Sequence, residues 1–236
     1  MNKRPAKDWV SFWDSPHPIY VNARHLEVHY RTLAEDIVAH LPVRGSRVLD
    51  FGCGEALHAA DIGAVTWELY LCEAAPKLRA RLKQRFAGDP KIKVLSPDNI
   101  ERLPVASLDL VIANSVVQYL SREELEHLLA IWRRRLRLGG QVVIADVLGP
   151  RQSALADVRA LLSFAAKNGF LLAALRGLVR TVFSPYRSLR ARLGLSHYSE
   201  GEMLDLLQAA GFNAERMQAN LGHNQTRMAF RATKTG

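Results

Sequence analysis

The sequence has little that could span a membrane, form disulfides or hold zinc. Cys53 and Cys72 are its only cysteines, and both fall at the ends of expected buried strands. They are expected to be reduced packing thiols in the cytoplasm, without a disulfide or zinc framework. Although 48% of the residues are hydrophobic, no uninterrupted apolar run is long enough to cross a bilayer. Residues 1–5 lack the apolar core of a signal peptide, which also favours a cytoplasmic location.

The most informative segment is RVLDFGCGEA, residues 47–56. Its apolar run from Val48 to Phe51 predicts a strand that is buried on both faces. Gly52 and Gly54 then allow a sharp turn, and they let the backbone approach a ligand that any Cβ would exclude. Because a helical pattern follows, a ligand would lie at strand carboxyl ends beside a helix N-terminus, where open α/β sheets bind cofactors.

A dinucleotide-binding fingerprint needs a third glycine at position 57, but Leu57 stands there. Asp50, two residues before the first glycine, completes the pattern D-x-G-x-G. In this form the segment resembles motif I of the class I S-adenosylmethionine (SAM)-dependent methyltransferases of small-molecule type. An NAD-dependent oxidoreductase would share the strand and the turn, and a strand–helix turn without a ligand is the third interpretation.

Later segments fit the same family at the expected intervals. Residues 65–72 predict a second strand that ends at Glu73, 19 positions after Gly54. A carboxylate there can accept hydrogen bonds from both ribose hydroxyls, or it can cap the helix that begins near Pro76. After a third strand, residues 92–95, the resemblance places Asp98 and Asn99 at the adenine, although the same residues would suit a simple turn.

The remaining pattern completes a sheet. Strands are expected at 108–114 and 138–146, with a capping box at Ser121 and Glu124 between them. A second capping box, Ser199 and Glu202, begins a late helix, and strands at 213–221 and 225–233 follow with a turn at 222–224. A final antiparallel hairpin at a sheet edge is the family's hallmark. The predicted fold is therefore α/β, a seven-stranded, mostly parallel, doubly wound sheet with a C-terminal antiparallel hairpin.

Four parts of one domain are expected. Residues 43–148 form the cofactor-binding core, which the resemblance covers, and residues 199–236 complete it with the last helix and the edge hairpin. Residues 1–42 form an N-terminal lid and helical extension rich in aromatic residues. Tyr20 and Tyr30 in this extension are expected either to contact the cofactor or acceptor or to pack on the core.

Histidines are the candidates for a general base, because an imidazole can accept a proton from a hydroxyl or ammonium group near neutral pH. His25 and His29 share one helix face, and His197 precedes the Ser199 cap. Metal binding is not predicted, because no third ligand has suitable spacing. Each histidine can equally be an ordinary surface or core residue, and Tyr119 is a further candidate on the acceptor side.

The fourth part, residues 149–198, is a basic, apolar helical insertion that is expected to act as a substrate lid. Its central residues 151–193 carry eight Lys and Arg but one Asp, a net +7 of the chain's formal +9. Residues 170–183 are intensely apolar, with Arg176 and Arg180 four apart on one face. Such a helix can lie at a membrane surface, roof an apolar pocket or contact a partner subunit. Nucleic acid is not favoured as a partner, because no RNA-binding module is recognisable.

The resemblance implies methyl transfer from SAM, leaving S-adenosylhomocysteine (SAH), to a small or lipid-like acceptor at an O, N or C atom. The protein, a monomer or homodimer, would mainly align the acceptor with the methyl group and exclude water. No catalytic residue is assigned. The expected cofactor-binding residues are Asp50, Phe51, Gly52, Cys53, Gly54, Glu73, Asp98, Asn99, Asn114 and Tyr20. A fold retained only for binding an adenosyl ligand or a membrane surface is the alternative to an enzyme.

Overall fold

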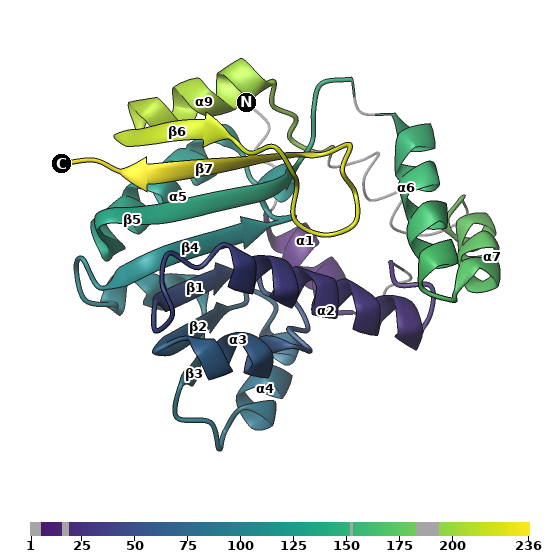
Figure 1. Cartoon of the computed structure of the whole chain (residues 1–236), viewed down its shortest axis with the longest axis horizontal. Helices are drawn as coiled ribbons and strands as arrows, with labels where there is room; N and C mark the ends of the chain where they lie inside the picture. Colours follow the sequence, from purple (N-terminus) through teal and green to yellow (C-terminus); the bar gives the residue numbers. More distant parts are fainter. Residues whose placement is uncertain (1–5, 16–18, 152, 183–193) are drawn as a thin grey trace.

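A seven-stranded sheet forms the centre of the computed structural model, which describes residues 6–15, 19–151, 153–182 and 194–236 (Figure 1). The strand order is β3-β2-β1-β4-β5-β7-β6, and β7 runs antiparallel to both of its neighbours. This order confirms the predicted fold. The strands are β1 Arg47–Phe51, β2 Glu68–Cys72, β3 Ile92–Leu95, β4 Leu108–Asn114, β5 Leu136–Val147, β6 Phe212–Arg216 and β7 Met228–Lys234.

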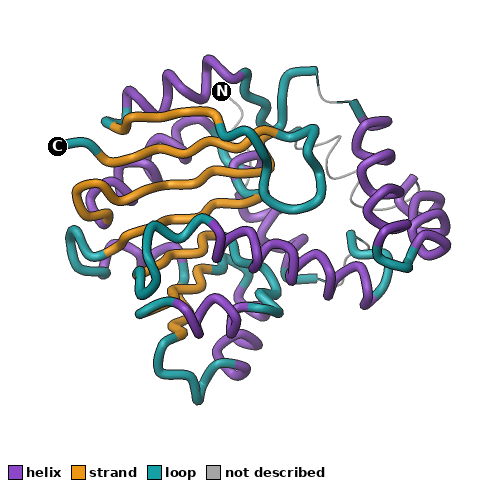
Figure 2. The backbone as a smooth tube through the Cα atoms, in the orientation of Figure 1, coloured by secondary structure: helices purple, strands orange, loops and turns teal. Residues whose placement is uncertain are grey.

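Helices cover both faces of the sheet (Figure 2). Alternate strand residues enter different cores: Val48 packs with Ile37 of α2, whereas Leu49 packs in the same core as Trp132 of α5. This alternation is expected for a sheet buried on both faces. The helices are α1 Ala6–Trp13, α2 Ala23–Ala39, α3 Ala59–Val65, α4 Pro76–Arg85, α5 Arg122–Arg135, α6 Ala154–Lys167, α7 Leu171–Val182 and α9 Glu200–Ala209, with 3₁₀ turns η1 Pro97–Arg102 and η2 Val117–Tyr119.

Local sequence signals located most element ends well. Both predicted capping boxes form, at Ser121 with Glu124 and at Ser199 with Glu202. The second strand begins later than predicted, at Glu68, because Val65 still belongs to α3. The 3₁₀ turn was not predicted: residues 97–102 form η1 rather than a simple turn.

The predicted tight turn at 222–224 was wrong. Strands β6 and β7 are joined by the longer loop 217–227. Polar side chains hold this loop in shape: Gln225 donates to the backbone oxygens of Asn220 and Gly222, and the Asn220 amide donates to the Asn224 oxygen. Short apolar–polar alternation could not reveal that these side chains, rather than strand pairing, satisfy the loop backbone.

The insertion forms the helix pair α6 and α7 at the end of the sheet where the parallel strands have their carboxyl ends (Figure 1). Phe164, Phe170 and Ala174 pack against Val28 of α2, and Gly177 lies directly on Val21. The other side of α7 is open, with Leu172 71% exposed. Arg187, Arg190 and Arg192 of the predicted basic cluster lie outside the described residues. Within the described part, no helix is long and apolar enough to cross a membrane.

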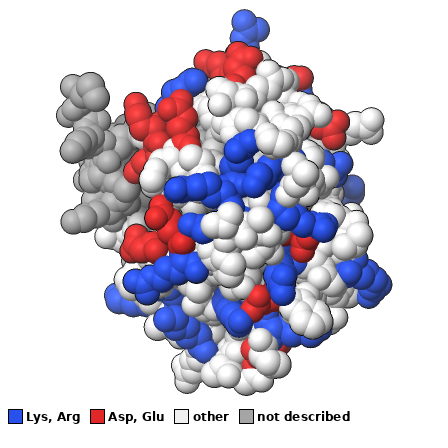
Figure 3. Space-filling view, turned by 90° about the vertical axis from the view of Figure 1, so that its left-hand side faces the viewer, with Lys and Arg blue, Asp and Glu red and all other residues white. Residues whose placement is uncertain are grey.

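Basic side chains also gather at the opposite end of the sheet. Figure 3 views the end at which the parallel strands begin and shows many Lys and Arg side chains across that face. Several of them are neutralised locally, as Arg137 is by Asp109 and Lys93 by Glu68. The insertion is therefore not the only source of the chain's positive charge.

Candidate functional site

The turn after β1, residues 52–55 (the glycine turn), is tied to β2 and α2. Gly52 and Gly54 have φ of +75° and +60°, values that disfavour a side chain. The Gly54 N–H donates to Glu73 Oε2 at 3.0 Å, and the Glu55 N–H donates to the Tyr30 hydroxyl at 2.8 Å. A Cβ at Gly54 would overlap that hydroxyl. Sequence analysis missed this role of Tyr30, because nothing local to residue 30 marks a contact 25 residues away.

Two buried carboxylates meet beside this turn. Glu73 accepts from the Gly54 and Ala75 N–H groups, one bond to each oxygen, at 3.0 and 2.8 Å. Burial raises its pKa, and it raises the pKa of Asp50 to about 7 with help from the nearby Glu73 charge. Among the described residues no cation pairs with Asp50, which leaves its carboxylate suited to a ligand ammonium group.

The remaining expected cofactor contacts lie along the carboxyl ends of the strands. Asp98 is exposed at the start of η1, and Asn99 beside it donates to Ser96 Oγ at 3.0 Å. Asn114 ends β4, where its buried Oδ1 has no hydrogen-bond partner among the residues that the structure describes. Phe51 and Cys53 are buried, so only their backbone atoms are available at the turn.

The aromatic N-terminal segment packs on Tyr119, which was predicted to lie on the acceptor side. Trp9 of α1 is buried with its ring 4.5 Å from that of Tyr119, and Trp13 lies 5.9 Å from the same ring. Asp14 reaches α4, where its Oδ1 accepts from the Lys77 and Leu78 N–H groups at 2.7 and 3.3 Å. Helix α4 has no side-chain cap of its own, so α1 is anchored directly after Glu73.

The predicted pair His25 and His29 is joined by a third histidine, His223 from the β6–β7 loop (together, the imidazole cluster). Ring centroids within the cluster lie 6.3–6.5 Å apart. The insertion covers them, since Phe170 stacks on His25 at 5.0 Å and Phe164 on His223 at 4.4 Å. Desolvation lowers the pKa of His25 to about 4 and that of His29 to about 3, so all are neutral near pH 7.

Tyr20 connects this cluster to the glycine turn. Its ring lies 5.4 Å from His29, and its hydroxyl lies 3.3 Å from the Tyr30 hydroxyl that holds Glu55. Burial raises the Tyr20 pKa to about 12. His197, by contrast, is exposed, and its Nδ1 lies 2.9 Å from the Leu195 oxygen. No group of three His, Cys, Asp or Glu side chains in the described part of the chain could hold a metal ion.

These groups fit SAM by their chemistry. The buried Asp50 carboxylate has no cation beside it in the described part of the chain, and each Glu73 oxygen retains a lone pair for a ribose hydroxyl. The Asn114 Oδ1 described above lies at the end of β4, which is the neighbour of β1 in the sheet, and the glycine turn follows β1. A ligand with an ammonium group, two adjacent hydroxyls and a polarised methyl group would satisfy all three.

Comparisons with known proteins point to the same chemistry. Residues 49–144 match the family model of the methyltransferase domain. The match covers 96 of the 236 residues and runs from β1 to β5, the parallel part of the sheet. Phosphoethanolamine N-methyltransferase 1 of Haemonchus contortus, solved with phosphoethanolamine and SAH, shares the fold at a TM-score of 0.66 and 16% identity, over 100% of this chain and 50% of that one. The family match supports the predicted methyltransferase domain over residues 49–144, and the solved structure confirms the predicted fold.

Other relatives differ in substrate. The N-methyltransferase NodS of Bradyrhizobium japonicum, solved with SAH, matches at a TM-score of 0.59 and 14% identity, over 99% of this chain and 100% of that one. A tRNA U34 carboxymethyltransferase of Trichlorobacter lovleyi is 31% identical over 112 residues, which are 45% of this chain and 34% of that protein. The chain thus spans about a third of the length of the curated relative it matches.

Proposed function

We propose that this chain transfers the methyl group of SAM to a small-molecule acceptor held between the carboxyl ends of β4 and β5 and the insertion. The observation that carries the proposal is the pair of buried carboxylates at the glycine turn, Asp50 and Glu73. SAM supplies an activated methyl group, so the protein needs mainly to orient the acceptor and exclude water.

Within this proposal each predicted cofactor contact has a place. Asp50 and the backbone of residues 51–54 bind the methionine part, Glu73 binds the ribose, and Asp98 with Asn99 borders the adenine. Asn114 faces the methyl group, and Tyr20 closes the site from the N-terminal side. His25 and His29 serve as neutral lining rather than as bases, because their lowered pKa values make them poor proton acceptors at pH 7.

The acceptor side is lined by aromatic and polar side chains. His223 of the imidazole cluster and Phe164 also border a groove of ≈ 920 Å³ between α2, α6 and residues 223–226. Arg159 and Lys167 stand on its rim, which suits an acceptor with an anionic group. This supports a small, charged or aromatic acceptor over a bulky one.

Calorimetric titration with SAM, SAH and NAD tests the proposal. We expect micromolar binding of SAM and SAH but not of NAD. Glu73→Ala should weaken SAH binding about 100-fold, because two hydrogen bonds to a charged group contribute about 1.5 kcal/mol each or more. Glu68→Ala, at the other end of β2, is the matched control and should bind normally. Binding of NAD alone, or no binding of either adenosyl ligand, would refute the function.

Contact with a membrane surface is a second candidate role, favoured by the open side of α7. Leu171, Leu172 and Leu175 are 40%, 71% and 45% exposed beside the exposed Arg176. Co-sedimentation with vesicles containing anionic lipid should be lost in the double variant Leu172→Asp, Leu175→Asp. Light scattering of the wild type and this double variant tests whether a second copy of the chain covers α7 instead.

An acceptor screen should include tRNA, because the curated relatives are tRNA U34 carboxymethyltransferases.

A further inference from the structure

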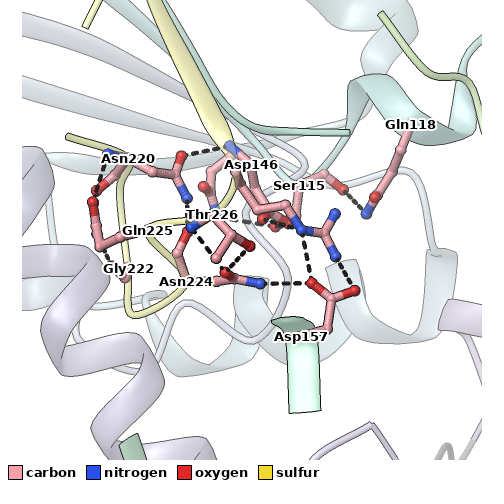
Figure 4. Close-up of polar contacts among 11 residues, drawn as sticks. Ser115, Gln118, Asp146, Asp157, Asn220, Gly222, Asn224, Gln225 and Thr226 are labelled. Atoms are coloured by element: carbon pink, nitrogen blue, oxygen red, sulfur yellow. Dashed lines mark hydrogen bonds and ion pairs between the residues drawn. The ribbon is translucent and has the colours of Figure 1, made fainter. Parts of the chain in front are cut away.

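Two neighbouring strands end in the same unusual way. Ser115, just after β4, has φ of +58°, and Asp146, near the end of β5, has φ of +59°. Neither is glycine, and residues held in this region concentrate at functional sites. The two strands are in register there, since the Ser115 N–H donates to the Ala145 oxygen. The backbone therefore turns at the same level after both strands, and there the Ser115 hydroxyl donates to Asp146 Oδ2 at 2.7 Å (Figure 4).

The Asp146 carboxylate is held from several elements at once. Its other oxygen, Oδ1, lies 4.0 Å from Arg227 Nε, and its own N–H donates to Asn220 at 2.8 Å. Arg227 is kept in place by two bonds to Asp157 of α6, at 2.9 and 3.2 Å. We call Ser115, Asp146, Asp157 and Arg227 the Asp146 network (Figure 4). It fastens α6 of the insertion to the ends of β4 and β5.

The network lies on the acceptor side of the glycine turn. Val116, the residue after Ser115, packs so closely on Gly52 that a Cβ there would overlap it. In the sheet, β4 is the neighbour of β1 and β5 is the next strand outward. The Asp146 side chain is 22% exposed, so a bound molecule can reach it. Burial raises the pKa of this carboxyl group, and Arg227 and the Ser115 hydroxyl oppose that rise.

We propose that Asp146 Oδ1 accepts a proton from the atom that is methylated, while Ser115 and Arg227 position the carboxylate. The acceptor would therefore be a hydroxyl or amine compound rather than a carbon acid or a thioether. This inference rests on the proposed methyl transfer. In the balanced step, the acceptor's O or N bonds to the methyl carbon, the carbon–sulfur bond of SAM breaks with its electron pair left on sulfur, and the acceptor's proton passes to Asp146.

The test begins with SAH binding, which should be unchanged within threefold in Asp146→Asn and Ser115→Ala. A wild-type protein that fails to bind SAH would refute the proposed function itself. SAH release is then followed with a panel of acceptors: ethanolamine, phosphoethanolamine, tyramine, catechol and, as a carbon acid, acetylacetone. We expect turnover with at least one amine or hydroxyl compound, a loss of 100-fold or more in kcat for Asp146→Asn, and about tenfold for Ser115→Ala.

Two further readouts separate proton acceptance from a structural role. At SAM concentrations that saturate the protein throughout, so that the titration of Asp50 does not limit binding, the rate should fall on acidification in the wild type but not in Asp146→Asn. The pH at which the rate falls should be higher in Arg227→Gln, because that variant removes the cation near Asp146. It should be lower in Asp157→Asn, because that variant frees Arg227 to interact with Asp146. In Asp146→Gly, a residue suited to the positive φ, added formate should restore part of the rate.

Several outcomes would overturn the inference. They are turnover of Asp146→Asn within threefold of wild type, absence of formate rescue, and turnover of acetylacetone alone. An SAH-binding protein that turns over no amine or hydroxyl compound of the panel would also overturn it.

Discussion

The part of the molecule that we propose to bind the cofactor (the cofactor half: β1, β2, β3 and the glycine turn) and the part that we propose to bind the acceptor (the acceptor half: β4, β5, β7 and the insertion) are built in different ways. In the cofactor half the key contacts are close in sequence, as Gly54 and Glu73 are at a separation of 19 residues. In the acceptor half they are remote, since Arg227 meets Asp157 across 70 residues. The first half is therefore encoded in continuous motifs, whereas the second is assembled only when the chain has folded.

The halves also have opposite electrostatics. Buried carboxylates with raised pKa values mark the cofactor half, and buried imidazoles with lowered pKa values mark the contact between α2 and the insertion. In both places burial favours the neutral form. Because one group is acidic and the other basic, acidification should affect the two halves with opposite sign.

Beyond the two variants already described, Glu73→Ala and Asp146→Asn, the largest expected effect is a steric one in the cofactor half. Gly54→Ala should lower the free energy of unfolding by about 1–3 kcal/mol through backbone strain, and weaken SAH binding tenfold or more by displacing Tyr30. Gly45→Ala is the control, since Gly45 has a similar φ of +85° but open space around it. Equal loss of SAH binding in both variants would show that strain, rather than the Tyr30 contact, matters.

Asp50 should make SAH binding depend on pH. Its folded pKa of about 7 means that the ligand's ammonium group must displace a proton at lower pH, so affinity should fall about tenfold per unit below pH 7. Stability should change the other way: the folded state keeps a proton that the unfolded state loses, so stability falls as pH rises from about 4 to 7. Asp50→Asn should flatten both profiles in calorimetry and urea unfolding, and an unchanged profile would contradict this assignment.

The imidazole cluster should destabilise the insertion in acid. His25 and His29 have folded pKa values of about 4 and 3, below the ordinary 6.5, so the folded state binds fewer protons than the unfolded state between those limits. Stability is then complete above pH 6.5 and falls on acidification by at most about 1.4 kcal/mol per pH unit for each histidine.

Hydrogen exchange at pH 7.5 and 5 locates this effect. Faster exchange in α6 and α7 is expected at pH 5, with β1 and β2 little changed, and His29→Gln should reduce the difference. Uniform acceleration over the whole sheet would mean that the two halves unfold together.

The smallest effect is expected where α1 is anchored. Asp14→Ala removes the carboxylate that caps α4 from outside, and loss of such a cap costs about 1 kcal/mol. Exchange should quicken in α1 and in the first turn of α4 while β4 and β5 stay protected. Asp61→Ala is the matched control on α3, where the carboxylate is exposed.

The contrast between the halves also explains what could be predicted. The seven-stranded fold, the capping boxes and the acid at the end of β2 follow from local patterns of apolar, glycine and capping residues. Asp146 was visible only as the last residue of a predicted strand, because its importance depends on Ser115 and Arg227. Likewise, the i, i+4 spacing indicated His25 and His29, but nothing in the sequence joined them to His223, which lies in a loop whose shape is set by side-chain hydrogen bonds.

The anchored α1 helix gives the protein a built-in optical reporter. Trp9 and Trp13 lie against Tyr119, while Asp14 in the same segment is bonded to the helix that follows Glu73. Of the other two tryptophans, Trp132 is fully buried and Trp67 is 65% exposed. In the variant Trp67→Phe, tryptophan fluorescence, excited at wavelengths that tyrosine does not absorb, would thus come mainly from Trp9 and Trp13 near the proposed acceptor side. Occupancy of the site could then be followed in real time, without a label and without knowing the acceptor.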